Sequence, residues 1–124
     1  MKKQILLIDD DEDEIEILNS ALQRMQFDYE CIWAQSAEHA LQLLHRYTPD
    51  LIFLDYKMPK INGLRCLMEM KKIENLRKVP IVLYSTYIDE VNYHKAISLG
   101  ATTCIQKPST LNILIKKLQE MLRY

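Results

Sequence analysis

The sequence contains little of what would define a disulfide-stapled, zinc-binding or membrane-spanning protein. Its three cysteines, Cys31, Cys66 and Cys104, are an odd set without CxxC spacing, so neither a disulfide framework nor a zinc site is predicted. No apolar stretch approaches the roughly 20 residues that a transmembrane helix needs. The apolar run at residues 5–8 leads directly into acids and does not fit a signal peptide. These absences favour a protein of the reducing cytoplasm, without a membrane partner.

The sequence also lacks an excess of either charge. The 124-residue chain has 16 Lys and Arg against 17 Asp and Glu, a formal net charge of −1, so no overall field favours nucleic acid or an anionic membrane. The charges are unevenly distributed, because residues 9–16 are acidic at every position except Ile15. A hydrophobic content of 48% with 27% charged residues is typical of one globular domain, here residues 1–124.

Short apolar runs alternate with amphipathic stretches along the whole chain, which predicts a doubly wound α/β domain. The predicted strands are residues 4–8, 29–34, 51–54, 81–84 and 102–106. The predicted helices are residues 11–25, 37–47, 64–73, 89–100 and 111–122, with Ser36, Asp89 and either Ser109 or Thr110 as caps. This alternation predicts parallel βαβ units with right-handed crossovers in a three-layer α/β/α sandwich. We expect no output or DNA-binding domain, because the fifth helix ends the chain.

Polar side chains follow four of the predicted strands. The first strand ends at Asp9 and Asp10, the third at Asp55, the fourth at Ser85 and the fifth at Lys107. The carboxyl ends of parallel strands meet at one edge of a sheet, where open α/β sheets bind their ligands. We therefore expect three carboxylates, a hydroxyl and an ammonium group in one cleft.

Carboxylates gathered in this way repel one another. At a separation of about 4 Å and an effective dielectric near 20, each pair costs on the order of 4 kcal/mol before relaxation. Such a cluster persists by binding protons or a hard cation, and an all-oxygen site with room for water and phosphate oxygens suits Mg²⁺. Asp55 is then a candidate phosphoryl acceptor, since carboxylates form aspartyl-phosphates. Lys107 and Ser85 are candidate partners of the phosphate oxygens.

Four motifs in this order resemble the receiver domain of response regulators in two-component signalling, and the resemblance covers the whole chain. They are Leu7-Ile-Asp-Asp-Asp11, Asp55-x-x-Met-Pro59-x-x-Asn-Gly63, a hydroxyl five residues after Pro80, and Gly100-Ala101 followed by Lys107-Pro108. The resemblance implies a stand-alone receiver with a flavodoxin-like (βα)5 fold and strand order 2-1-3-4-5.

The resemblance also implies a role for each strand-end residue. Asp55 would be the phosphoacceptor, with Ser85 and Lys107 completing the phosphoryl site. The implied ligands of Mg²⁺ are Asp10, Asp55, the backbone carbonyl of Lys57 and, mainly through a bound water, Asp9. The phosphoryl donor would be a sensor histidine kinase or a phosphotransfer protein. The domain would catalyse only its own phosphorylation and dephosphorylation, and it would signal by binding a downstream protein, with a homodimer as an open alternative.

Cys104 and Thr86 depart from the usual receiver pattern. Cys104, three positions before Lys107, stands where receivers usually have an aromatic residue that moves together with the hydroxyl at the position of Ser85. The Cys104 side chain is too small to move in the same way. Thr86 stands where a small Ala or Gly is common and narrows access to the phosphoryl group. Lys57 and Tyr87 flank the expected path of an attacking water, which predicts slow spontaneous dephosphorylation.

Alternative interpretations remain at this stage. One is a phosphorylation-independent interaction module, which Cys104 favours and the intact strand-end residues oppose. A flavodoxin would need a Ser/Thr/Gly-rich loop after the first strand, where acids stand, and a haloacid-dehalogenase-type phosphatase would need an Asp at the position of Lys57. In purely structural terms, the acids after Asp9 would be a solvated helix start, Asp55 a turn former, and Ser85 and Lys107 ordinary strand-end residues.

Overall fold

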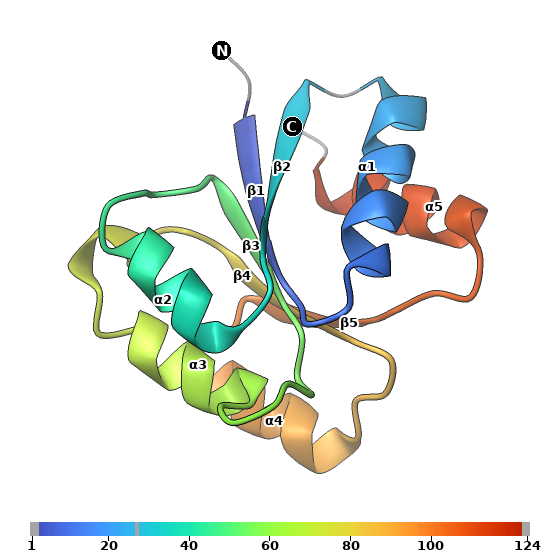
Figure 1. Ribbon diagram of the computed structural model, residues 1–124. Helices are drawn as coiled ribbons and strands as arrows, with labels where there is room; N and C mark the ends of the chain where they lie inside the picture. Colours follow the sequence, from blue (N-terminus) through green and yellow to red (C-terminus); the bar gives the residue numbers. More distant parts are fainter. Residues whose placement is uncertain (1–2, 27, 123–124) are drawn as a thin grey trace.

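The computed structural model describes residues 3–26 and 28–122. It contains a five-stranded parallel sheet flanked by helices on both faces (Figure 1). The elements in chain order are β1 (Lys3–Ile8), α1 (Asp13–Met25), β2 (Tyr29–Ala34), α2 (Ala37–Leu44), β3 (Leu51–Leu54), α3 (Gly63–Met70), the 3₁₀ helix η1 (Glu74–Leu76), β4 (Ile81–Ser85), α4 (Glu90–Ser98), β5 (Thr103–Gln106) and α5 (Leu111–Met121).

The strand order is β2-β1-β3-β4-β5, which confirms the predicted doubly wound fold. All four strand pairs are parallel, and the register aligns their carboxyl ends. Ile8 at the end of β1 lies opposite Ala34 of β2 and Leu54 of β3, and Ser85 of β4 lies opposite Gln106 of β5. The residues that follow these strands therefore share one edge of the sheet.

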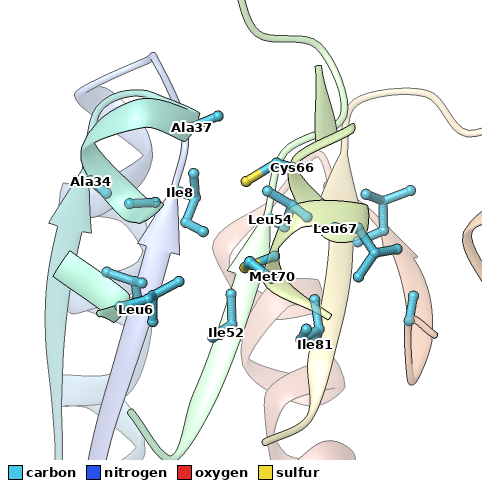
Figure 2. Packing of buried hydrophobic residues seen from close by; sticks show 14 of the residues in the cluster. Leu6, Ile8, Ala34, Ala37, Ile52, Leu54, Cys66, Leu67, Met70 and Ile81 are labelled. Atoms are coloured by element: carbon cyan, nitrogen blue, oxygen red, sulfur yellow. The ribbon is translucent and has the colours of Figure 1, made fainter. Parts of the chain in front are cut away.

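Two hydrophobic clusters cover the two faces of the sheet, because successive side chains of a strand point to opposite faces. In β1, Leu6 and Ile8 pack toward α2, α3 and α4 (Figure 2), whereas Ile5 and Leu7 pack toward α1 and α5. Strands with both faces covered are apolar at every position, which is why β3 reads Leu-Ile-Phe-Leu.

The helix ends differ from the prediction where local hydrogen bonds decide them. Helix α1 begins at Asp13 rather than at residue 11, because the Asp11 side chain accepts the Asp13 backbone N–H at 3.0 Å. Helix α2 ends at Leu44, three residues earlier than predicted, and α3 ends at Met70 instead of residue 73. The segment after α3 contains η1, which the sequence pattern did not predict.

Side-chain caps fix four of the helix starts. Ser36 and Asp89 accept the backbone N–H three residues ahead, as predicted, and Thr110 rather than Ser109 caps α5. Asn62 caps α3 in the same way, although the sequence pattern had placed it only in a turn. At the end of α4, Gly100 has φ +109°, and two backbone bonds close a Schellman motif there.

In the described part of the chain, no helix has both the length and the apolar composition that crossing a membrane requires.

Candidate functional site

The predicted carboxylates meet at the carboxyl edge of the sheet. Ligand oxygens of Asp9, Asp10 and Asp55 lie within 4.8 Å of one another. Asp9 is fully buried and Asp55 is 6% exposed, whereas Asp10 is exposed to solvent. The strands hold the two buried acids firmly, because the Asp9 N–H donates to Ala34 at 3.1 Å and the Asp55 N–H donates to Ile8 at 2.9 Å. The backbone hydrogen bonds of the sheet thus continue to Asp9 and Asp55 and fix where their side chains begin.

Lys107 is the cation of this cluster. Its Nζ lies 2.7 Å from Asp9 Oδ2, 3.6 Å from Glu14 Oε2 and 3.8 Å from Asp55 Oδ1. Although burial lowers the pKa of Lys107, the hydrogen bond and charge of Asp9, followed by the charges of Asp55 and Glu14, raise it overall. The ammonium is therefore charged at neutral pH. The backbone N–H of Lys107 donates to the Ser85 carbonyl at 2.7 Å, so these two residues occupy neighbouring strand ends.

The carboxyl group of Asp55 is buried and lies near a second negative charge, that of Asp9. Burial, followed by the charge of Asp9, raises its pKa to about 6. The charge of Lys107 and a hydrogen bond from Ser85 lower the pKa, and the charge of Asp10 raises it slightly. At neutral pH Asp55 is therefore mostly ionised and poorly solvated, and it shares the Lys107 ammonium with Asp9, which are favourable conditions for a nucleophilic carboxylate.

The loop after Asp55 is held close to its backbone by a glycine. A Cβ added at Gly63 would lie 2.4 Å from the Asp55 carbonyl oxygen and 2.8 Å from Tyr56 Cα, so only glycine fits. The Gly63 N–H also donates to the Tyr56 carbonyl at 2.8 Å. The loop turns at Lys60, a non-glycine residue with φ +66°. This arrangement fixes the direction in which the chain leaves Asp55.

An open depression lies beside the acidic cluster. Asp10, Lys57 and Asn62 line it together with Tyr56, Met58 and Pro59, and its volume is about 400 Å³. Asp10 and Lys57 thus line one open space. The depression gives access to the cluster from outside.

The donor set fits a hard divalent cation. It consists of carboxylate oxygens from Asp9, Asp10 and Asp55, with the Lys57 backbone at the rim of the same depression. Three carboxylates against the single ammonium of Lys107 leave an excess of negative charge. Oxygen ligands, local negative charge and access for water are the features that Mg²⁺ sites need.

Two residues of the site escaped the sequence prediction. The indole N–H of Trp33, in β2, donates to the Asp9 backbone carbonyl at 2.8 Å. Glu14 contacts Lys107 from α1, and burial raises its pKa, partly offset by the charge of Lys107. The only available signal for Trp33 was its position one residue before the end of β2. Glu14 had no separate signal, because acids surround it in the sequence.

The residues that depart from the usual receiver pattern lie in β5 or just after β4. Cys104 is half-buried in β5 and lines a hollow with Tyr93 and His94 of α4. Thr86 is exposed, and Tyr87 has 67% of its surface exposed. The small side chain of Cys104 therefore lies at the edge of a hollow between β5 and α4.

The response regulator receiver domain is the family whose model matches this chain, over residues 5–119. The chain therefore belongs to the response regulator receiver family of two-component signalling, which confirms the resemblance seen in its motifs. The transcriptional regulatory protein CpxR homolog of Haemophilus influenzae is 33% identical over 97% of this chain and 50% of its own length. The phosphate regulon regulatory protein PhoB of Pseudomonas aeruginosa is 30% identical over 98% of this chain and 52% of its own. The chain spans about half the length of these curated relatives.

Solved receiver structures superpose on almost the whole chain. The phosphorylated cyanobacterial phytochrome response regulator RcpA has a TM-score of 0.87 at 26% identity, covering 98% of this chain and 91% of RcpA. The Mn²⁺-bound form of the response regulator Rcp1 has a TM-score of 0.83 at 26% identity, covering 98% of this chain and 93% of Rcp1. The fold is therefore that of receiver domains.

Proposed function

We propose that this receiver domain accepts a phosphoryl group on Asp55, in a Mg²⁺-dependent reaction, from a sensor histidine kinase or a phosphotransfer protein. The single observation that supports this most is the setting of Asp55. It is a buried carboxylate beside two further acids, with the Lys107 ammonium 3.8 Å away. The phosphorylated domain then signals by binding another protein. It catalyses no reaction besides its own phosphorylation and dephosphorylation.

The transfer needs one bond to form and one to break. An Oδ of Asp55 attacks the phosphorus of a phosphohistidine, the P–O bond forms, and the P–N bond breaks with its electron pair returning to the imidazole nitrogen. Asp9, Asp10 and the Lys57 carbonyl would hold Mg²⁺, which when bound neutralises charge on the phosphoryl oxygens. Positioning and charge neutralisation therefore supply most of the catalysis.

Lys107 and Ser85 hold the transferred group after the reaction. The Lys107 ammonium pairs with Asp9 at 2.7 Å in the unphosphorylated protein, so it has to turn from Asp9 toward the new phosphoryl oxygens. The Ser85 hydroxyl, which already hydrogen-bonds Asp55, donates to a phosphoryl oxygen in the product. Both contacts are stronger with a dianionic phosphoryl group than with a single carboxylate.

Intact mass measurement after incubation with Mg²⁺ and a phosphohistidine kinase tests the proposal. We expect one added phosphoryl group on the wild type and on Asp28→Asn, a control at an exposed acid outside the site. Asp55→Asn should take up none. A small-molecule donor is the weaker test, because Thr86 restricts access. Addition that persists in Asp55→Asn, or its absence from the wild type, would overturn the proposal.

The hollow at Cys104 favours one second candidate, a module that binds its partner independently of phosphorylation. A receiver without an aromatic residue at the Cys104 position of β5 can keep the same α4–β5 surface whether or not it is phosphorylated. Partner affinity distinguishes the two candidates. Equal affinity of the phosphorylated wild type and of Asp55→Asn for the same partner would support the second one.

A further inference from the structure

Lys107 is contacted by a carboxylate that lies outside the strand-end set. Glu14 is the second residue of α1, and its Oε2 lies 3.6 Å from Lys107 Nζ. The side chains of both residues are mostly covered, with 16% of Glu14 and 12% of Lys107 exposed. An ion pair with this degree of burial is screened much less by solvent than one on the surface.

Glu14 differs from the acids around it. Its neighbours Asp11, Glu12, Asp13 and Glu16 are all exposed, whereas Glu14 is half-buried. The exposed acids suit the positive end of the α1 dipole and need no further explanation. Glu14 instead extends from the helix to the ammonium at the sheet edge.

The Lys107 ammonium lies among charged and aromatic neighbours that come from several elements. Asp9 lies at 2.7 Å and Asp55 at 3.8 Å. The ring of Tyr84, which is only 3% exposed, has its centroid 5.7 Å from Nζ. Among the residues that the structure describes, Glu14 is the charged neighbour that comes from a helix instead of a strand end. It therefore draws the ammonium toward α1, while Asp55 draws it toward the acceptor oxygen.

We propose that Glu14 is a positioning residue for Lys107, which holds the ammonium toward α1 in the unphosphorylated protein and opposes its transfer to the phosphoryl group. The proposal rests on the function proposed for Asp55. It has two consequences of opposite sign. The charge of Glu14 helps to attract a divalent cation to the acidic edge, and it weakens binding of an anionic phosphoryl group at the same edge.

Glu14→Gln separates these two effects, because the amide keeps the shape of the side chain and removes its charge. We expect Mg²⁺ alone to bind about threefold more weakly, since one attractive charge is lost and the freed ammonium competes for the acids. Beryllofluoride, a phosphoryl mimic, should bind about threefold more tightly at saturating Mg²⁺, because the ammonium moves to it without an opposing pull.

The emission of Trp33 serves as the readout. Trp33 is the single tryptophan of the chain, and its indole donates to the Asp9 carbonyl. Both titrations can thus be followed by fluorescence without a kinase. Glu16→Gln is the matched control, since it removes the same charge from an exposed position of α1 and should change neither affinity. Glu14→Asp, which keeps the charge on a shorter arm, should lie between the wild type and Glu14→Gln.

The outcomes distinguish the proposal from its alternatives. Mg²⁺ and beryllofluoride affinities that fall together in Glu14→Gln would mean that Glu14 only supports local structure. Affinities equal to those of Glu16→Gln would mean that Glu14 does not act on Lys107. Either result, with normal phosphorylation of the wild type on Asp55, overturns the role of Glu14 alone. A wild type that accepts no phosphoryl group overturns the proposed function as well.

Discussion

Asp55 is held in its charged form at a cost to the stability of the fold. Its pKa rises from 3.8 to about 6 on folding, chiefly through burial. The folded state therefore binds the proton more tightly than the unfolded chain does. It follows that the contribution of Asp55 to stability falls as the pH rises from about 4 to about 6, and that the full penalty persists above that range.

Replacement of Asp55 by asparagine should relieve this penalty. In a metal-free buffer at pH 7.5 we expect Asp55→Asn to raise the free energy of unfolding by roughly 2 kcal/mol, because the amide carries no charge to desolvate. Urea denaturation at several pH values measures the effect, which should disappear near pH 4. Asp28→Asn, at an exposed position, should behave like the wild type. A metal-free Asp55→Asn that is less stable than the wild type at pH 7.5 would contradict this account.

The lifetime of the phosphoryl group is a second property of individual residues. Lys57 and Tyr87 are exposed and flank the expected path of an attacking water, so we expect a lifetime far longer than seconds in the absence of a phosphatase. Tyr87→Ala should shorten the lifetime by about threefold, which corresponds to less than about 1 kcal/mol of barrier. Loss of mass label over time measures both quantities, and a wild-type lifetime of seconds would refute the prediction.

Helix α3 begins at Gly63, which packs against the backbone of Asp55 and Tyr56. The segment from Asp55 to Gly63, called the acceptor loop below, therefore depends on the position of α3. Gly63→Ala would force a methyl group against the Asp55 carbonyl oxygen, 2.4 Å away. We expect it to lower the free energy of unfolding by about 1–3 kcal/mol and to weaken Mg²⁺ binding as the loop shifts. Thermal denaturation and a Mg²⁺ titration followed by Trp33 emission test the two effects.

Gly100→Ala is the matched control for that prediction. Gly100 has φ +109°, and a Cβ there would meet only the end of the flexible Lys71 side chain. Its replacement should cost about 1–2 kcal/mol through backbone strain and leave Mg²⁺ binding unchanged. Equal loss of Mg²⁺ affinity in both variants would indicate general loosening of the fold and not a specific effect on the acceptor loop.

The elements themselves were predictable to different degrees. The central strands β1, β3 and β4 were found from their apolar runs, because a buried parallel strand needs apolar side chains on both faces. The edge strands β2 and β5 are only partly buried and have mixed sequences. Helix ends were less predictable, since they depend on local hydrogen bonds such as the one from the Asp13 N–H to the Asp11 side chain. Helix α4 had the weakest pattern, and in the structure Ala96 is its single buried residue. A helix that buries so few residues needs no regular apolar stripe, so its sequence shows little hydrophobic periodicity.

In the whole molecule, the site forms at the carboxyl ends of the strands, at the edge of the sheet that separates the two hydrophobic clusters. Asp9, Asp55, Ser85 and Lys107 were predicted because parallel register brings strand ends together wherever the side chains point. Glu14 and Trp33 were not, because their contacts depend on how α1 and β2 lie against β1. Such contacts arise from tertiary packing and leave no regular spacing in the sequence.

Binding of Mg²⁺ should stabilise the whole domain. A cation that binds the folded state alone raises the free energy of unfolding by about 1.4 kcal/mol at ten times its Kd. We expect the midpoint of thermal unfolding to rise with Mg²⁺ and not with NaCl of equal ionic strength. Asp10→Asn removes an exposed carboxylate that we propose as a Mg²⁺ ligand and leaves the core undisturbed, so it should abolish the shift. A shift of the same size in Asp10→Asn would place the cation elsewhere.

The backbone bond from the Lys107 N–H to the Ser85 carbonyl, 2.7 Å long, directly joins the two residues that we propose to bind the phosphoryl group. Their spacing is consequently a property of the sheet and does not depend on the loops that follow them. The β4–α4 and β5–α5 loops could therefore be exchanged for those of another receiver while this backbone bond keeps the two strand ends side by side.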